Sequence, residues 1–210
     1  MISLAEYLED PCGKLSIPYW KARTLVVPEN IKVVHDRDFS ESLLGNWTDE
    51  RYFRLRHTME NLRRTILPDF DMVTAGPDDW DQLVSIINRS YPDLQVSQEQ
   101  LKRCRETAVY RRDLWLLVRE INTGIFVGSG IADFDAEAGE LSLEWIQVLP
   151  EYRRRRIGQA IVSELLFRGQ GAKFATVSGK LDNRTNPEAL YRQCGFSGND
   201  IWHVLSRGRS

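Results

Sequence analysis

Four consecutive arginines, Arg153 to Arg156, stand directly before Gly158 and the start of an apolar pattern at helical spacing. The first turn of a helix offers unpaired backbone N–H groups and the positive end of the helix dipole. With guanidinium charge beside them, these groups favour an anion, and glycine lets the backbone approach it closely. The pattern therefore predicts a phosphate-binding turn. A solvated charge run is the alternative, but the strand-like segment Leu141 to Leu149, ended by Pro150, favours an ordered strand, turn and helix.

Glu144 is a second candidate for chemistry, because it lies inside the strand-like segment between Leu143 and Trp145. Strand alternation is expected to put Glu144 on the face opposite both neighbours, together with Ser142 and Ile146. If that face lines an acceptor cleft, the carboxylate acts as a general base or holds a cationic group. If it faces solvent, Glu144 is a surface charge.

The arginine turn resembles the acetyl-CoA pyrophosphate loop of the GNAT acetyltransferase superfamily, which often reads Val-x-Pro-x-Tyr-Arg-Gly-x-Gly-Ile-Gly. The matching residues are Val148, Pro150, Tyr152, Arg153, Ile157 and Gly158. Two residues depart from the pattern, because Arg154 and Arg156 stand where the family commonly has glycine. A bulky side chain at Arg156 could restrict how the backbone wraps a pyrophosphate.

A second segment near the C-terminus resembles the family's Asn…Ala-Leu-Tyr-x-x-x-Gly-Phe motif. It consists of Asn186, Ala189, Leu190, Tyr191, Gly195 and Phe196. One helix and one strand fit between the two motifs, as in the family. The resemblance covers about two thirds of the chain, from Asp69 to Arg207.

The resemblance implies an acetyl-CoA-dependent N-acetyltransferase that moves an acetyl group directly to a primary amine of a small molecule or peptide, without a metal. It also implies that one strand, the turn and the following helix bind the cofactor. The implied residues are Ile146, Gln147, Val148, Arg153, Arg154, Arg155, Arg156, Ile157, Gly158, Gln159 and Ala160. Asn183 and Asn186 are rival candidates for a further cofactor contact, and helix capping alone would also explain Asn186 before Pro187.

Tyr191 matches the family tyrosine that protonates the coenzyme A thiolate, and a backbone N–H of Ile146 or Gln147 is expected to stabilise the oxyanion. The alternative for Tyr191 is a helix tyrosine that packs on the sheet. The alternative for the whole chain is a non-catalytic sensor or interaction module of the same fold that binds coenzyme A. Arg156 in place of glycine favours the module, and Tyr191 favours the enzyme.

The elements that must position these residues form a mixed α/β pattern. After residue 69 we predict a strand, two helices, three mostly antiparallel strands, a helix, a strand, a helix and a final strand. Their main ranges are 71–75, helices from 78 and 97, 114–121, 125–134, 141–149, a helix from 157, 174–178, 187–194 and 201–206. With the resemblance, this order implies a GNAT-like central twisted mixed β-sheet flanked by helices.

Residues 1–68 lie outside the resemblance and are predicted to form an N-terminal α/β extension of the domain at 69–210. We expect a helix at Leu4 to Leu8, an extended piece from Ser16 to Lys21, a strand at Ile31 to Val34 and a helix at Tyr52 to Leu67. This extension is expected to cover the acceptor site or to serve as an interaction arm.

Composition limits the classes of partner. Twenty-eight Lys and Arg against thirty Asp and Glu give a net charge of −2, so no global field attracts nucleic acid or an anionic membrane. Three cysteines without a Cys-x-x-Cys pair, and an acidic N-terminus unlike a secretory signal, favour a cytoplasmic protein. The three histidines lack metal-ligand spacing, so no metal is expected. The oligomeric state stays open, with a homodimer as one alternative.

Overall fold

The computed structural model describes residues 2–91, 95–183 and 185–207. The chain divides into two compact units, which are described here one at a time. The first consists of Met1–Thr58 and Thr176–Ser210, and the second of Met59–Ala175. Both combine strands with helices, so the predicted mixed α/β fold class is confirmed. No helix within the described ranges is both long and apolar enough to cross a membrane.

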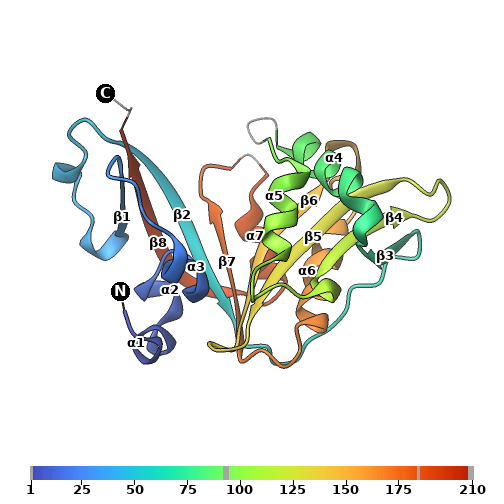
Figure 1. Ribbon diagram of the computed structural model, residues 1–210, viewed down its shortest axis with the longest axis horizontal. Helices are drawn as coiled ribbons and strands as arrows, with labels where there is room; N and C mark the ends of the chain where they lie inside the picture. Colours follow the sequence, from blue (N-terminus) through green and yellow to red (C-terminus); the bar gives the residue numbers. More distant parts are fainter. Residues whose placement is uncertain (1, 92–94, 184, 208–210) are drawn as a thin grey trace. The chain divides into compact units, whose positions relative to one another are not determined.

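The first unit is built from two segments that are far apart in the sequence (Figure 1). Its strands follow the order β1-β8-β2-β7. The strand bounds are β1 Ile31–His35, β2 Thr48–His57, β7 Phe174–Lys180 and β8 Ser197–Ser206. The helices are α1 Leu4–Glu9, α2 Pro11–Lys14, α3 Tyr19–Thr24 and α7 Pro187–Gln193, with short 3-10 turns η1 Asp36–Asp38 and η2 Glu41–Leu43. The late strand β8 lies between the early strands β1 and β2 and pairs antiparallel with both.

The predicted helix from Tyr52 to Leu67 is wrong, because this part of the chain begins as strand β2. Phe53, Arg54 and Leu55 are all buried, so both faces of the strand are covered at this point. Pairing with β8 satisfies the backbone along β2, for example at Phe53 and Ile201. Residues 58–69, between β2 and β3, form no helix, and Ile66, inside the range predicted as helix, is 81% exposed.

The predicted extended piece from Ser16 to Lys21 is also wrong, because helix α3 begins at Tyr19. Pro18 immediately precedes the helix, where a missing N–H costs nothing. Tyr19 is buried and stacks on Tyr7 of α1 with ring centroids 5.2 Å apart. The burial of this aromatic pair favours the helix.

The second unit holds four antiparallel strands in the order β6-β5-β4-β3. Their bounds are β3 Phe70–Thr74, β4 Trp115–Glu120, β5 Phe126–Asp135 and β6 Glu140–Val148. The helices are α4 Trp80–Ser90, α5 Gln98–Arg105 and α6 Ile157–Arg168, with 3-10 turns η3 Pro77–Asp79, η4 Arg112–Leu114 and η5 Pro150–Tyr152. Each strand and helix predicted in this unit is confirmed to within a few residues. Ser97, the predicted start of the second helix, caps α5 by accepting a hydrogen bond from the Gln100 N–H.

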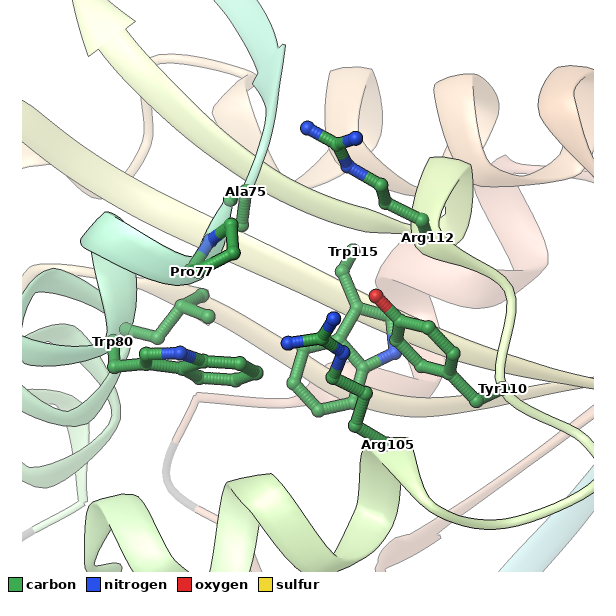
Figure 2. A pocket seen from close by; sticks show the side chains of 9 residues that line it. Ala75, Pro77, Trp80, Arg105, Tyr110, Arg112 and Trp115 are labelled. Carbon is green, nitrogen blue, oxygen red and sulfur yellow. The ribbon is translucent and has the colours of Figure 1, made fainter.

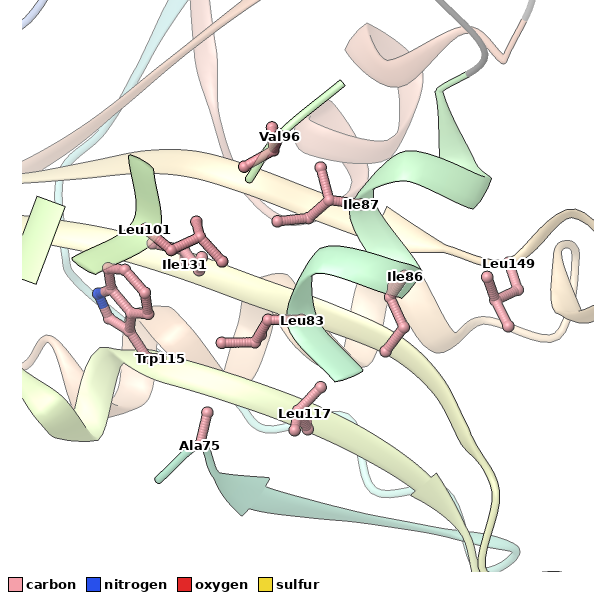
Figure 3. Packing of buried hydrophobic residues seen from close by; sticks show 10 residues of the cluster. All are labelled: Ala75, Leu83, Ile86, Ile87, Val96, Leu101, Trp115, Leu117, Ile131 and Leu149. Carbon is pink, nitrogen blue, oxygen red and sulfur yellow. The ribbon is translucent and has the colours of Figure 1, made fainter. Parts of the chain in front are cut away.

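Helices α4 and α6 cover opposite faces of these strands. Ile131 of β5 packs into the apolar cluster beneath α4, which is shown in Figure 3. A Cβ atom on the neighbouring residue Gly130 would lie 2.3 Å from Ile161 Cγ2 and 3.1 Å from Leu165 Cδ1, both on α6. Glycine at 130 therefore lets β5 and α6 approach closely. The cluster under α4 comprises Ala75, Leu83, Ile86, Ile87, Val96, Leu101, Trp115, Leu117, Ile131 and Leu149.

A buried carboxylate ties the segment after β2 to α6. Glu164 of α6 accepts from Arg64 Nε at 2.6 Å and from Arg168 Nε at 2.7 Å. Arg168 also donates to Thr74 Oγ1 at 2.7 Å, at the end of β3. The two guanidinium groups offset the cost of burying the Glu164 charge.

Candidate active site

Strand β6 contains a bulge at Glu144. Ile131 pairs with Trp145 and Ala132 with Leu143, so Glu144 is an extra residue with no partner position on β5. Because Ile131 and Ala132 point to opposite faces, Leu143 and Trp145 do so too. The expectation that these two neighbours share a face is therefore wrong. Bulges often redirect side chains beside active sites, and Glu144 is half-buried here.

The strand beyond the bulge has polar contacts at three successive residues. The Ile146 carbonyl accepts from Tyr91 Oη at 3.4 Å, and the Val148 carbonyl accepts from Arg153 Nε at 3.1 Å. Gln147 is buried, and its Oε1 accepts from Ser129 Oγ at 2.9 Å. These contacts fix the end of β6 against α4 and the arginine turn.

Tyr91 is a site residue that sequence reasoning missed. It directly follows Ser90, the last residue of α4, and no motif in the sequence marks it. Burial raises the pKa of its phenol, while the charge of Arg153 acts in the opposite direction. The phenol therefore stays protonated near neutral pH and serves as a hydrogen-bond donor toward β6.

The four arginines of the turn do different things. Arg153 donates from Nε to the Val148 carbonyl and from Nη2 to the Ser90 carbonyl at 3.1 Å, so it fastens the turn to β6 and to the C-terminal end of α4. Arg155 pairs with Glu120 at 3.4 Å and lies over the ring of Phe70, with 4.7 Å between guanidinium carbon and ring centroid. These two side chains are largely committed to holding the turn.

Arg154 and Arg156 adopt the left-handed backbone conformation, with φ of 62° and 61°. This is the conformation that glycine adopts most readily, and these are the two positions where the resembling motif commonly has glycine. Both side chains are exposed. Anion-binding concavities in other proteins are built from successive backbone N–H groups in turns that contain such left-handed residues.

Helix α6 begins directly behind this turn. Arg156 is its N-cap residue, and no side chain within the described chain caps the helix. The Arg156 carbonyl accepts from the Ala160 N–H at 3.0 Å, the first bond of the helix. The N–H groups of the first turn, from Ile157 to Gln159, therefore remain for a ligand or water. Arg156 Nε reaches Gln159 Oε1 at 3.1 Å, so this guanidinium stays beside the helix start.

Tyr191, Asn183 and Asn186 belong to the first unit, whereas Glu144, the end of β6 and the arginine turn belong to the second. Tyr191 is buried on α7 and contacts Phe53 and Phe196, with centroid distances of 6.1 and 5.8 Å. Both asparagine side chains make local hydrogen bonds. Asn183 Oδ1 accepts from the N–H and hydroxyl of Thr185. Asn186 Oδ1 accepts from the Ala189 N–H, so the capping interpretation of Asn186 is confirmed.

The Gly-Phe pair of the second motif has a structural reason. Gly195 has φ of +92°, and a Cβ atom there would lie 2.8 Å from His57 Nε2. Phe196 packs on the same His57 ring at 5.3 Å. Burial lowers the pKa of His57, so the ring is neutral and serves as a packing surface.

Comparison with known proteins agrees with this geometry. Residues 111–198 match the Acetyltransferase (GNAT) domain family. No curated protein matches the chain.

Several solved structures share its fold. A GCN5-related N-acetyltransferase from Sphaerobacter thermophilus has a TM-score of 0.69 and 18% identity, and the match covers 88% of this chain and 62% of that protein. A GCN5-related N-acetyltransferase from Kribbella flavida has a TM-score of 0.62 and 14% identity, and the match covers 86% of this chain and 68% of that protein. A GNAT-family acetyltransferase from Colwellia psychrerythraea has a TM-score of 0.58 and 16% identity, and the match covers 83% of this chain and 64% of that protein. This chain thus spans less than two thirds of the Sphaerobacter protein. Residues 111–198 thus match a GNAT acetyltransferase domain, and the chain shares the fold of these acetyltransferases.

Proposed function

We propose that this chain is an acetyl-CoA-dependent N-acetyltransferase that transfers acetyl directly to a primary amine of a small molecule or peptide. The observation that carries the proposal is the uncapped start of α6 behind two left-handed arginines. Backbone N–H groups, the helix dipole and guanidinium charge all favour a phosphate there. The residues present therefore fit the pyrophosphate of coenzyme A.

In this proposal the cofactor-binding residues divide into two kinds. Arg154 and Arg156, together with the backbone from Ile157 to Gln159, hold the phosphates. Arg153 and Arg155 act indirectly, because their guanidinium groups already contact the Val148 carbonyl and Glu120. The carbonyls and N–H groups of Ile146 to Val148 orient the pantetheine amides.

When bound, acetyl-CoA supplies an activated acetyl thioester. An N–H of Ile146 or Gln147 stabilises the negative charge that develops on the acetyl oxygen. Tyr191 donates a proton to the departing thiolate. Glu144, the bulged residue, either accepts a proton from the amine as a general base or pairs with the protonated amine and so positions it.

The acceptor is proposed to be a cationic amine, and Glu144 is the carboxylate best suited to receive it. Two other acidic residues, Glu140 and Asp182, are less suited to this role. Glu140 is 1% exposed, and Asp182 lies 3.5 Å from Arg51. A cytoplasmic location remains our inference, and it rests on the spacing of the three cysteines, which form no Cys-x-x-Cys pair.

Calorimetric titration with acetyl-CoA tests cofactor binding. The double variant Arg154→Gln, Arg156→Gln is expected to weaken binding by about tenfold or more, since it removes two charged phosphate contacts. Arg103→Gln is the matched control, because Arg103 is equally exposed but lies on α5 and pairs with Glu99. Acetyl-pantetheine, which lacks the phosphates, is expected to bind the double variant and the parent chain equally. Absence of heat at millimolar acetyl-CoA would refute the proposal.

Release of free coenzyme A in the presence of a panel of primary amines tests catalysis. Tyr191→Phe is expected to lower kcat by about 10²-fold or more without changing the acetyl-CoA dissociation constant. Binding of acetyl-CoA without turnover of any amine would instead favour a coenzyme A-binding module.

A further inference from the structure

A pocket of about 350 Å³, part of it open to solvent, lies in the second unit between the end of β3, the start of α4, the end of α5 and the segment that leads into β4. Figure 2 shows its side chains converging from these elements. The lining residues are Ala75, Gly76, Pro77, Trp80, Leu83, Arg105, Tyr110, Arg112 and Trp115. Three aromatic rings and two guanidinium groups therefore surround one hollow.

The aromatic walls are packed edge to face. The Trp115 ring lies 5.7 Å from that of Trp80, at an interplanar angle of 83°, and 5.5 Å from that of Tyr110, at 73°. Trp115 is only 1% exposed, and its indole N–H has no acceptor among the described residues. A buried N–H donor without an acceptor is costly.

The charge at the pocket is positive. The Arg105 guanidinium carbon lies 6.0 Å from the Trp80 ring centroid and 5.9 Å from that of Tyr110. Within the described ranges neither Arg105 nor Arg112 has a carboxylate partner, and no acidic residue lines the pocket. Neighbouring arginines differ in this respect, because Arg103 pairs with Glu99 and Arg111 with Asp113.

This pocket is separate from the arginine turn. The turn contacts the last residue of α4 through Arg153 and Ser90, whereas the pocket uses Trp80, the first residue of α4. The eleven residues of α4 span about 16 Å. Buried side chains of Leu83, Ile86 and Ile87 fill the space beneath the helix between its two ends.

We propose that this pocket binds a small organic carboxylate with a flat apolar body, at a site distinct from that of acetyl-CoA. The flat body packs on Trp80, Tyr110 and Trp115, which supply apolar area at fixed orientations. The carboxylate pairs with Arg105 and Arg112, whose forked donors match its two oxygens.

Benzoate is a suitable probe, with benzyl alcohol and benzylamine as neutral and cationic counterparts of similar shape. In ¹H–¹⁵N NMR spectra with assigned tryptophan side chains, benzoate is expected to shift the indole signals of Trp80 and Trp115 in a saturable way, with a roughly millimolar dissociation constant. Benzyl alcohol is expected to bind about tenfold more weakly, and benzylamine not at all.

Arg105→Gln and Arg112→Gln are each expected to weaken benzoate binding about tenfold, and Arg103→Gln on the same helix as Arg105 is the control. All three side chains are exposed, so the variants should fold, which the dispersion of the same spectra verifies. Three results would overturn the proposal: no saturable shift at tens of millimolar benzoate, equal binding of benzyl alcohol or benzylamine, or an equal loss in the Arg103 variant. The readout needs no acetyl-CoA, so it is independent of the catalytic proposal.

Discussion

Replacing Arg156 or Arg154 with glycine should give a more stable protein than replacing the same residue with alanine. At most positions in a protein the alanine variant is the more stable one. Both residues have the left-handed conformation, with φ near +60°. That conformation costs a residue with a Cβ atom about 1–2 kcal/mol. Glycine avoids this cost but loses about 0.5–1 kcal/mol more backbone entropy on folding. The difference leaves the glycine variant about 0.5–1 kcal/mol more stable than the alanine variant.

Arg155 supplies the control between these two positions. Its φ is not positive, so only the entropic cost of glycine applies there. The Arg155→Ala variant should therefore be more stable to unfolding than the Arg155→Gly variant by about 0.5–1 kcal/mol. Loss of the contact with Glu120 is common to both variants and cancels. The preference is therefore expected to reverse its sign along three consecutive residues.

Urea unfolding of the six single variants measures these differences, provided that the slope m is the same throughout. A thermal scan gives a second readout, because the Tm of a chain of this size should shift by about 2–4 °C for each kcal/mol of difference in unfolding free energy. If alanine is as stable as glycine at both 154 and 156, the turn is not left-handed in solution. The anion-binding concavity in front of α6 would then have no structural basis.

Four further substitutions test the second unit and the C-cap of α7. Gly130→Ala should destabilise the fold by about 1–3 kcal/mol, because its Cβ would lie 2.3 Å from Ile161 Cγ2; unchanged stability would mean that α6 yields easily. Glu164→Gln should cost about 3 kcal/mol in urea unfolding, and Glu151→Gln, at an exposed pair, less than about 1 kcal/mol. Burial raises the pKa of the Cys194 thiol from 9.0 to about 11, so its stabilising effect is full below pH 9 and is lost as the pH rises through 11. Cys194→Ala should remove this part of the alkaline loss, and an identical pH profile for the variant would contradict it.

The arginine turn could be predicted because its signals are local. A β-favouring run, Pro150, four arginines and an amphipathic pattern follow one another without interruption, and the structure has β6, η5 and α6 in that order. The left-handed conformation of Arg154 and Arg156 was not predictable from these residue types. It follows from the path that the chain must take between the end of β6 and the start of α6.

The errors concern elements whose partners are distant in sequence. Strand β2 was predicted as a helix because its apolar residues also fit a helical spacing, and its pairing partner β8 comes almost at the end of the chain. The bulge at Glu144 has no sequence signal, since it is a mismatch between β5 and β6. The pocket was missed because Trp80, Tyr110 and Trp115 become neighbours only when α4, α5 and β4 pack together.

The first unit is assembled from two separate segments of the chain, and this affects how the protein folds during its synthesis. The second unit is one continuous segment, so all of its strands have left the ribosome before β8 is translated. Strands β1 and β2 emerge early, but β8, which pairs with both, is the last strand in the sequence. At roughly 5–20 residues per second, β2 waits on the order of ten seconds with unpaired edges. During that interval it is a candidate for chaperone binding or for mispairing with another nascent chain.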